Sequence, residues 1–460
     1  MSDLNIYSSG YSAEPSARNR CCLYERLPLE NAAGRTVMYY LSLSPGHTLG
    51  DEMVGADQTG DLLRNLLSAH NAPYLFYNGC ERVVVQAAPT GDWLRYRNRI
   101  PEKHLIIKLP DSYKLKPGED RLMTGLRRAG AQFAMTLGEL GDLPKKPELL
   151  ACLDYVFVDH RHRSGLMTAF NGLKTVNKGL KSIGVRPPGE DFALQDASFY
   201  DLVLGYVQPE VLEYKERPVW QHELIRTIAE FFSGIYSLRG VSALARKYPE
   251  MGRAMYGILN SKKVIELTGK PNNMVTGGQV RLSQKDVTSL MCVCVGYQML
   301  CLAEQESFKR HGLSSRYSVE GVELGYFRRA LTSGRLLESL AEQPCDDYES
   351  RHAFMVGFLL LLPEMIRDTP ENIENEFMLT AVNSFHADTS TLGLVCNFIK
   401  ELRRHDSAKI NEFTTRSGLV ITKEDYYRLY FRAMIWADEV IRAITAGSQS
   451  QQKERQIIRI

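Results

Sequence analysis

The chain has 460 residues, of which 44% are hydrophobic and 24% charged, an ordinary globular composition that excludes a disordered or low-complexity chain. At about 150 residues per domain, this length predicts two or three domains with substantial cores. Lysine and arginine exceed aspartate and glutamate by 56 − 54 = 2, which removes the electrostatic argument for a dedicated nucleic-acid or anionic-membrane binder.

The cysteines indicate a reducing compartment. They number nine, and several lie in apolar stretches such as 291–295, as reduced core cysteines do. No CxxC pair is present, which argues against a thiolate zinc site. The amino terminus lacks the segments of a signal peptide, and apolar runs of about 13 residues or fewer are too short to span a bilayer. We therefore expect a soluble cytoplasmic protein.

Short β-rich and helical runs alternate after a loose segment over residues 1–19. Strands are predicted at Thr36–Leu43, Val83–Gln86, His104–Leu109, Gln132–Thr136, Tyr155–Asp159 and Leu202–Val207, with helices at Asp61–Leu67 and Asp120–Ala129. Such alternation predicts parallel strands joined by crossover helices. Residues 20–212 are therefore expected to form an α/β domain.

Amphipathic helical patterns dominate after a charged segment that ends in the helix breaker Pro218. Helices are predicted at His222–Ser233, Ser237–Lys247, Met251–Asn260, Gln284–Glu306, Val322–Gln343, Arg351–Ile366, Glu371–Ala381 and Lys423–Ala446. We expect an all-α domain over residues 213–410, a helical extension over 411–446 and a polar tail over 447–460.

General motifs do not decide the chemistry, because the sequence has no P-loop, GxSxG, HExxH or GxGxxG pattern. The order of its short segments is more informative; they are Arg26–Leu29, Tyr39–Ser44, Val83–Gln86, Leu105–Lys108, Gly130–Gly138, Asp154–Asp159, Leu204–Tyr206, Met251–Ser261 and Ala353–Leu361. This order resembles EAL-type domains joined to an HDOD domain, a family of bacterial cyclic di-GMP signalling. The resemblance implies a degenerate (β/α) barrel followed by an α-helical, HD-related domain.

The same resemblance identifies the family positions that have changed. In the barrel, the family's metal-binding and catalytic positions are occupied by Tyr40, Ser44, Gln86, Lys108, Thr136, Leu137, Phe157 and Leu204. Phe76–Asn78 offers a competing alignment for the position of Gln86. In the helical half, Leu360 and Leu361 stand in the place of the His-Asp pair of active relatives. Magnesium requires oxygen ligands, and of the expected acidic ligands only Asp159 can be placed.

A basic sequence, His160-Arg161-His162, follows Asp159 at the end of a predicted strand. It has the character of a basic loop at the end of a barrel where ligands bind. Asp159, Arg161 and Arg163 are the candidate ligand-binding residues there, with a phosphate as the ligand that the two arginines would contact. A competing hypothesis is a hydrolase whose rearranged metal site uses Asp154, Asp159, His160 and His162.

We expect a non-catalytic signalling scaffold that binds protein partners, such as signalling enzymes or regulators, in cyclic di-GMP-linked control of motility or biofilm. No catalytic residue, metal, cofactor, nucleic acid or membrane span is expected. Cyclic di-GMP binding is disfavoured, because Ser44 replaces an arginine that contacts the nucleotide in the family. A cyclic dinucleotide sensor remains an alternative, and homodimerisation is left open.

Overall fold

The computed structural model of the chain describes residues 25–32, 36–42, 82–87, 105–109, 119–128, 130–137, 147–187, 190–208, 211–212, 218–268, 283–310, 324–368, 390–404, 407–421 and 423–457. The chain divides into two compact units, Met1–Val207 and Gln208–Ile460. The boundary expected from the sequence lies between residues 212 and 213, inside the second unit. We call the two units the barrel unit and the helical unit.

The barrel unit is a closed barrel whose strands pair in chain order. The strands are β1 (Glu25–Glu30), β2 (Thr36–Ser42), β3 (Val83–Gln86), β4 (Leu105–Lys108), β5 (Gln132–Thr136), β6 (Tyr155–Asp159), β7 (Lys181–Val185) and β8 (Leu202–Leu204). From β2 to β8 each neighbouring pair is parallel. A barrel followed by helices is therefore confirmed at the level of architecture.

The expectation of parallel strands throughout is wrong for β1, which runs antiparallel to both β2 and β8. The connection from Glu30 to Thr36 is too short for a crossover, since a parallel connection needs a dozen or more residues whereas an antiparallel pair can be joined by a tight turn. The short connection therefore fixes the direction of β1, which the strand pattern alone does not.

Strand positions follow the pattern of apolar and β-branched residues closely. The predictions for β3, β5 and β6 match the observed bounds, and β8 ends at Leu204 rather than Val207. Gly205 has φ of 107°, a left-handed conformation that ends the extended strand. The predicted strands omit β1 and β7; β7 contains Gly184, which lowers β propensity.

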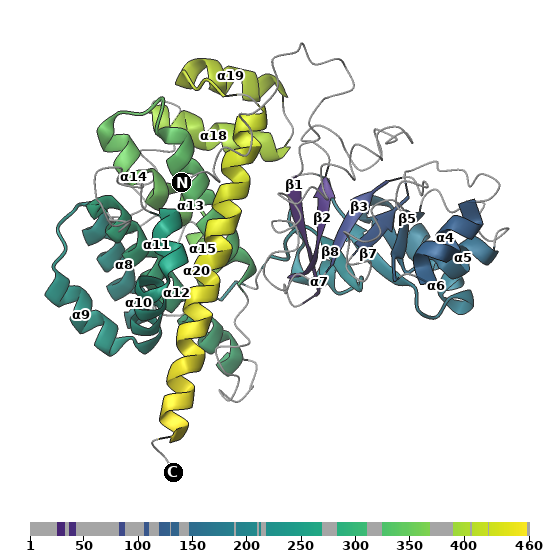
Figure 1. Cartoon of the computed structure of the whole chain (residues 1–460), viewed down its shortest axis with the longest axis horizontal. Helices are drawn as coiled ribbons and strands as arrows, with labels where there is room; N and C mark the ends of the chain where they lie inside the picture. Colours follow the sequence, from purple (N-terminus) through teal and green to yellow (C-terminus); the bar gives the residue numbers. More distant parts are fainter. Residues whose placement is uncertain are drawn as a thin grey trace. The chain divides into compact units, whose positions relative to one another are not determined.

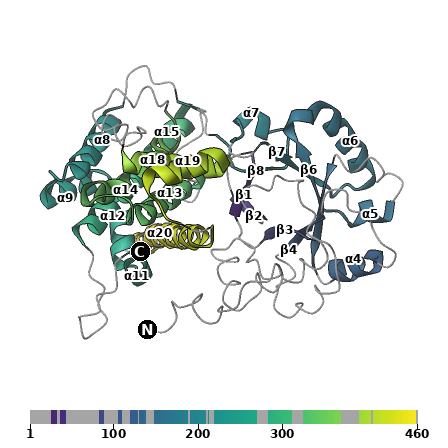
Figure 2. The same cartoon turned by 90° about the horizontal axis from the view of Figure 1, so that it is seen from above.

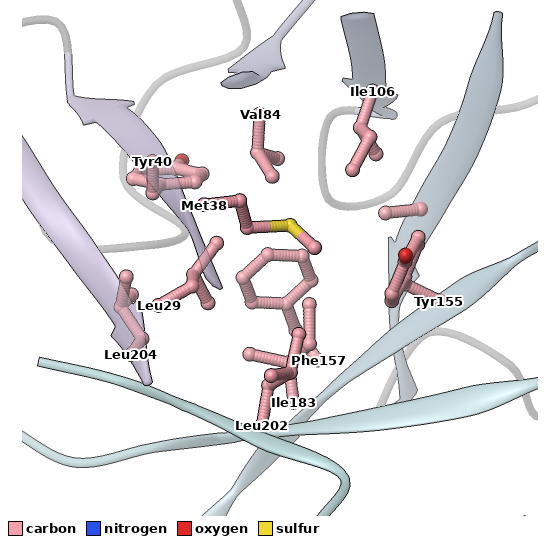
Figure 3. Close-up of a cluster of buried hydrophobic side chains, with 11 residues drawn as sticks. Leu29, Met38, Tyr40, Val84, Ile106, Tyr155, Phe157, Ile183, Leu202 and Leu204 are labelled. Carbon is pink, nitrogen blue, oxygen red and sulfur yellow. The ribbon is translucent and has the colours of Figure 1, made fainter. Parts of the chain in front are cut away.

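The barrel interior is filled by side chains, because residues at every second position of each strand face inward. Figure 3 shows these side chains meeting between the strands. The cluster comprises Leu29, Met38, Tyr40, Val84, Ile106, Ala134, Tyr155, Phe157, Ile183, Leu202 and Leu204. The interior is therefore a packed core of the kind that barrels of this size form.

Helices cover the outside of the barrel, as the view in Figure 2 shows for α4 (Glu119–Arg128), α5 (Pro147–Cys152) and α6 (Arg163–Val176). The helix predicted at Asp120–Ala129 is α4, and the one predicted at Asp61–Leu67 lies outside the described residues. A 3₁₀ turn (His160–His162) joins β6 to α6, and the short α7 (Leu194–Ala197) precedes β8.

The helical unit contains helices throughout its described residues. They are α8 (Val219–Phe232), α9 (Leu238–Lys247), α10 (Pro249–Asn260), α11 (Lys262–Thr268), α12 (Gln284–Arg310), α13 (Gly325–Ala341), α14 (Asp347–Leu359), α15 (Leu362–Ile366), α18 (Thr391–Arg404), α19 (Ser407–Ser417) and α20 (Lys423–Ile457). Helix α20, yellow in Figure 1, packs against α10, α11 and α13. It continues to Ile457, through most of the segment predicted as a polar tail.

The single helix predicted at Arg351–Ile366 is wrong, because the structure divides it into α14 and α15. Pro363 stands in the first turn of α15, where a proline is tolerated, whereas in a continuous helix it would remove a hydrogen bond and clash with the preceding turn. The helix predicted at Glu371–Ala381 lies outside the described residues.

From the sequence, the apolar runs are expected to be too short to span a bilayer, and helix α12 differs from that expectation. Gln284–Arg310 has a window of mean hydropathy 1.5, apolar and long enough to cross a membrane, and 78% of that window is buried within the protein. Its cysteines Cys292, Cys294 and Cys301 are buried and free. Burial of this extent is what a core helix shows, and α12 is accordingly the central helix of the unit.

Candidate functional site

Four of the residues that the resemblance aligns with metal-binding or catalytic positions meet inside the barrel, where β2, β3, β4 and β6 contribute Tyr40, Gln86, Lys108 and Phe157. Gln86 and Lys108 are the last residues of β3 and β4 and are paired across the sheet. Because Val84 and Ile106 face the core two residues earlier, the alternation of the strands turns Gln86 and Lys108 inward as well.

The amide oxygen of Gln86 is the polar centre of this group. The Lys108 ammonium donates a hydrogen bond to Gln86 Oε1 at 3.0 Å, and the Tyr40 hydroxyl donates to the same oxygen at 3.3 Å. Lys108 is fully buried, and Gln86 and Tyr40 are also buried. Side chains held in this way by each other and by the core cannot turn out to solvent without breaking these bonds.

The ring of Phe157 completes the group. Lys108 Nζ lies 5.5 Å from its centroid, within cation–π range. The Tyr40 ring meets Phe157 edge to face, with centroids 5.8 Å apart. The carboxyl ends of these strands therefore present an ammonium group, an amide, a phenol and a phenyl ring. A lysine nitrogen at this position is not among the oxygen ligands that magnesium prefers.

The other changed positions of the barrel add alkyl groups or fall elsewhere. Leu204 belongs to the core cluster beside Phe157. Leu137 is buried directly after β5, and Thr136 is half-buried at the end of that strand. Ser44 and the competing segment 76–78 lie outside the described residues. The positions that resemble catalytic ones are thus largely part of the packed interior.

Asp159 ends β6 and is engaged by its own neighbour. Its carboxylate accepts from the Arg161 backbone N–H at 2.9 Å and from the Arg161 guanidinium at 2.7 to 3.2 Å. The hydrogen bonds from Arg161 hold the pKa of Asp159 below its usual value. This is a local cap of the 3₁₀ turn, and it neutralises a carboxylate that the sequence offered as a ligand contact.

Arg163 points to a different partner. Its guanidinium lies 3.4 Å from Asp196 Oδ1, a residue of α7, and stacks over the Phe199 ring at 3.9 Å. Asp196 also pairs with Arg186, which follows β7. The three predicted ligand-binding residues are therefore not brought together around one position, since Asp159 and Arg161 form one pair and Arg163 belongs to another.

His160 lies at the centre of a polar cluster that the sequence pattern does not predict. Its Nδ1 is 3.0 Å from the Tyr200 hydroxyl, and its Nε2 is 3.3 Å from Arg186 Nη2 and 3.6 Å from Asp196 Oδ2. Burial and the nearby Arg186 charge lower the pKa of His160, and burial raises the pKa of Tyr200 to about 12. Both groups are accordingly neutral near pH 7.

Gly184 is the one feature of the sequence that indicates a close contact in this cluster. A Cβ on Gly184 would lie 2.5 Å from the Tyr200 ring, so the glycine is what lets that ring pack over β7 beside His160. A glycine inside a strand often marks such a close approach. The sequence alone does not say which side chain approaches.

The metal site suggested as a competing hypothesis is not assembled. Asp154 precedes β6 and Asp159 ends it, so the two lie roughly 16 Å apart along the strand at about 3.3 Å per residue. Asp154 accepts from Arg127 at 3.2 Å and from the Phe133 N–H at 3.1 Å. Within the described stretches, no group of three His, Cys, Asp or Glu side chains could hold a metal ion.

In the helical unit, the two leucines at the His-Asp position are part of the junction between α14 and α15. Leu360 is half-buried and Leu361 is buried. The nearby His352 has its ring nitrogens 2.8 Å from the Tyr348 carbonyl and 2.9 Å from the Phe232 carbonyl. Its ring therefore joins α14 to the end of α8 and is occupied with backbone groups.

Comparison with known proteins gives no family for the chain. No protein-family model matches it, and neither a curated protein nor a solved structure matches it.

Proposed function

We propose that this protein is a non-catalytic signalling scaffold of the EAL–HDOD type, cytoplasmic, acting through protein partners in cyclic di-GMP-linked control of motility or biofilm. The order of short segments supports the family, and a barrel followed by helices is compatible with it. The pathway rests on the resemblance alone.

One observation carries the non-catalytic part of the proposal. At the position where the family has a metal-binding glutamate, the Lys108 ammonium is buried, bonded to Gln86 at 3.0 Å and placed over Phe157. A magnesium ion there would meet a lysine amine, which is not an oxygen ligand, and an amide oxygen that already accepts two hydrogen bonds. Metal-assisted hydrolysis depends on oxygen ligands at that position.

Hydrolysis is tested with purified full-length protein, cyclic di-GMP and magnesium or manganese. We expect no turnover above the buffer rate, and equilibrium dialysis with manganese should give no stoichiometric binding. The same assays on an Asp159→Ala variant show whether any turnover or manganese binding depends on the barrel residue Asp159. Turnover, or stoichiometric manganese that this variant abolishes, would refute the proposal and favour the hydrolase.

The alternative function is a sensor that binds a cyclic dinucleotide through backbone and arginine contacts without cutting it. The exposed Arg161 at the end of β6 favours it, because a guanidinium matches a phosphate in charge and geometry. Isothermal titration separates the two. Binding of cyclic di-GMP tighter than about 10 μM, worth roughly 7 kcal/mol, would favour the sensor. Loss of that binding in Arg161→Ala would locate it at the end of β6 in the barrel.

The scaffold itself is tested by affinity purification from the native host with full-length protein as bait, followed by crosslinking. We expect reproducible partners with crosslinks to the helical unit. Residues 208–460, checked for folding by circular dichroism, serve as a second bait. Failure of both baits to retain a specific partner would contradict the scaffold, and retention by the full chain alone would assign the contact to the barrel unit.

A further inference from the structure

The residue after α15 has an uncommon backbone conformation. Arg367 has φ of 57° and ψ of 39°, and among the residues that the structure describes it is the one non-glycine residue with positive φ. The left-handed region is unfavourable for a residue with a Cβ. Such a conformation persists only where surrounding interactions hold it.

The guanidinium of Arg367 supplies part of that hold. Its Nη2 donates to Glu304 Oε1 at 2.6 Å, and its Nη1 donates to Ser307 Oγ at 3.1 Å. Glu304 and Ser307 are buried on the central helix α12. Charge-assisted hydrogen bonds in a buried setting are the strong class of hydrogen bond, so α12 fixes the turn from one side.

The backbone of the same turn holds the chain that enters the helical unit. The Leu212 N–H donates to the Arg367 carbonyl at 2.6 Å, and the Leu212 side chain is buried. The next residue, Asp368, accepts from Gln221 Nε2 at 2.7 Å. Gln221 and Asp368 are both buried.

Leu212 precedes the charged sequence 213–218 and Gln221 follows it on α8. Arg367 and Asp368 therefore hold the residues on either side of that sequence. The side chain of Arg367 also bonds this turn to α12. The left-handed conformation of Arg367 is what turns its carbonyl toward Leu212 while its side chain reaches α12.

We infer that the Arg367–Asp368 turn is a latch that fixes the entry of the chain into the helical unit and that opens locally, without unfolding of the unit. Opening costs the bonds to Leu212 and Gln221 but relieves the backbone strain. The latch is independent of the scaffold function, since it depends only on contacts within the helical unit.

Hydrogen exchange measured by mass spectrometry on the full-length chain tests the latch. Arg367→Gly removes the guanidinium while glycine tolerates the backbone angle, so it is the least disruptive variant. We expect about tenfold faster exchange in peptides containing Leu212 and Gln221, the size that loss of a charged hydrogen bond gives. Glu304→Gln should produce a smaller acceleration in the same peptides.

Arg328→Gln is the matched control, because it removes an ion pair of similar burial, to Asp438 at 2.8 Å, between α13 and α20. It should leave the Leu212 and Gln221 peptides at their original rates. Unchanged exchange of those peptides in Arg367→Gly would overturn the latch. Equal acceleration in Arg328→Gln, or acceleration throughout the unit in Arg367→Gly, would also overturn it, because opening would then be global.

Discussion

The contact between α13 and α14 depends on two glycines, and Gly357→Ala tests it. A Cβ on Gly357 would lie 2.7 Å from the Ser333 carbonyl oxygen and 2.9 Å from Gly334 Cα. Both atoms belong to the backbone of α13, so no rotamer change can make room. Gly357 is also the glycine of the segment 353–361 that carries the HDOD resemblance.

The size of the effect follows from that geometry. Ordinary contact begins at 3.4 Å, so the helices must separate by 3.4 − 2.7, or about 0.7 Å, which forfeits a quarter to a half of each dispersion contact across the interface. Overpacking of this kind costs about 1–3 kcal/mol, and the better helix propensity of alanine returns about 1 kcal/mol. We expect net destabilisation of up to about 2 kcal/mol, with about 1 kcal/mol as the central value.

Urea unfolding followed by tryptophan fluorescence measures this change, because two of the three tryptophans, Trp220 and Trp436, lie in the helical unit. The midpoint should fall by roughly 0.5 M, and by no more than about 1 M. Gly172→Ala on α6 is the control, since nothing lies within 4 Å of its added Cβ, and it should stabilise the barrel unit by about 0.5–1 kcal/mol. A Gly357→Ala midpoint at or above that of the original chain would refute the reasoning.

Three further predictions concern buried or paired groups. Gly184→Ala should displace the Tyr200 ring and lower its pKa from about 12 toward 10; a difference titration against Tyr200→Phe checks it, and an unchanged value contradicts it. Because Arg161 lowers the pKa of Asp159 below the ordinary 3.8, the pair stabilises the fold above that pH and the contribution is lost as pH falls through the lower value; Asp159→Asn should flatten this acid limb in thermal unfolding. Burial raises the pKa of Cys292 to about 12, so iodoacetamide at pH 8 should modify it only after unfolding, as mass spectrometry would show.

Local patterns in the sequence placed most elements, because strand and helix periods arise from neighbouring residues. The runs at Val83–Gln86 and Tyr155–Asp159 are strands with the predicted bounds. Two differences from the predictions have local causes that are visible in the sequence: the short connection that reverses β1, and Pro363, which divides a predicted helix. Strand β7 was not predicted for a tertiary reason. It contains a glycine, Gly184, because the ring of Tyr200, which comes later in the chain, packs directly against that position.

For the candidate site too, the sequence determines some features and the tertiary structure decides others. The sequence by itself determined which chemical groups stand at the positions that resemble catalytic ones, and hence that a lysine, Lys108, occupies the place that the resemblance gives to a carboxylate. Only closure of the barrel decided that Lys108 meets Gln86 and Phe157, because strands distant in sequence become neighbours through their register. Likewise, the left-handed Arg367 is invisible in the sequence, since its conformation is held by bonds to α12 and Leu212 that exist only in the folded chain.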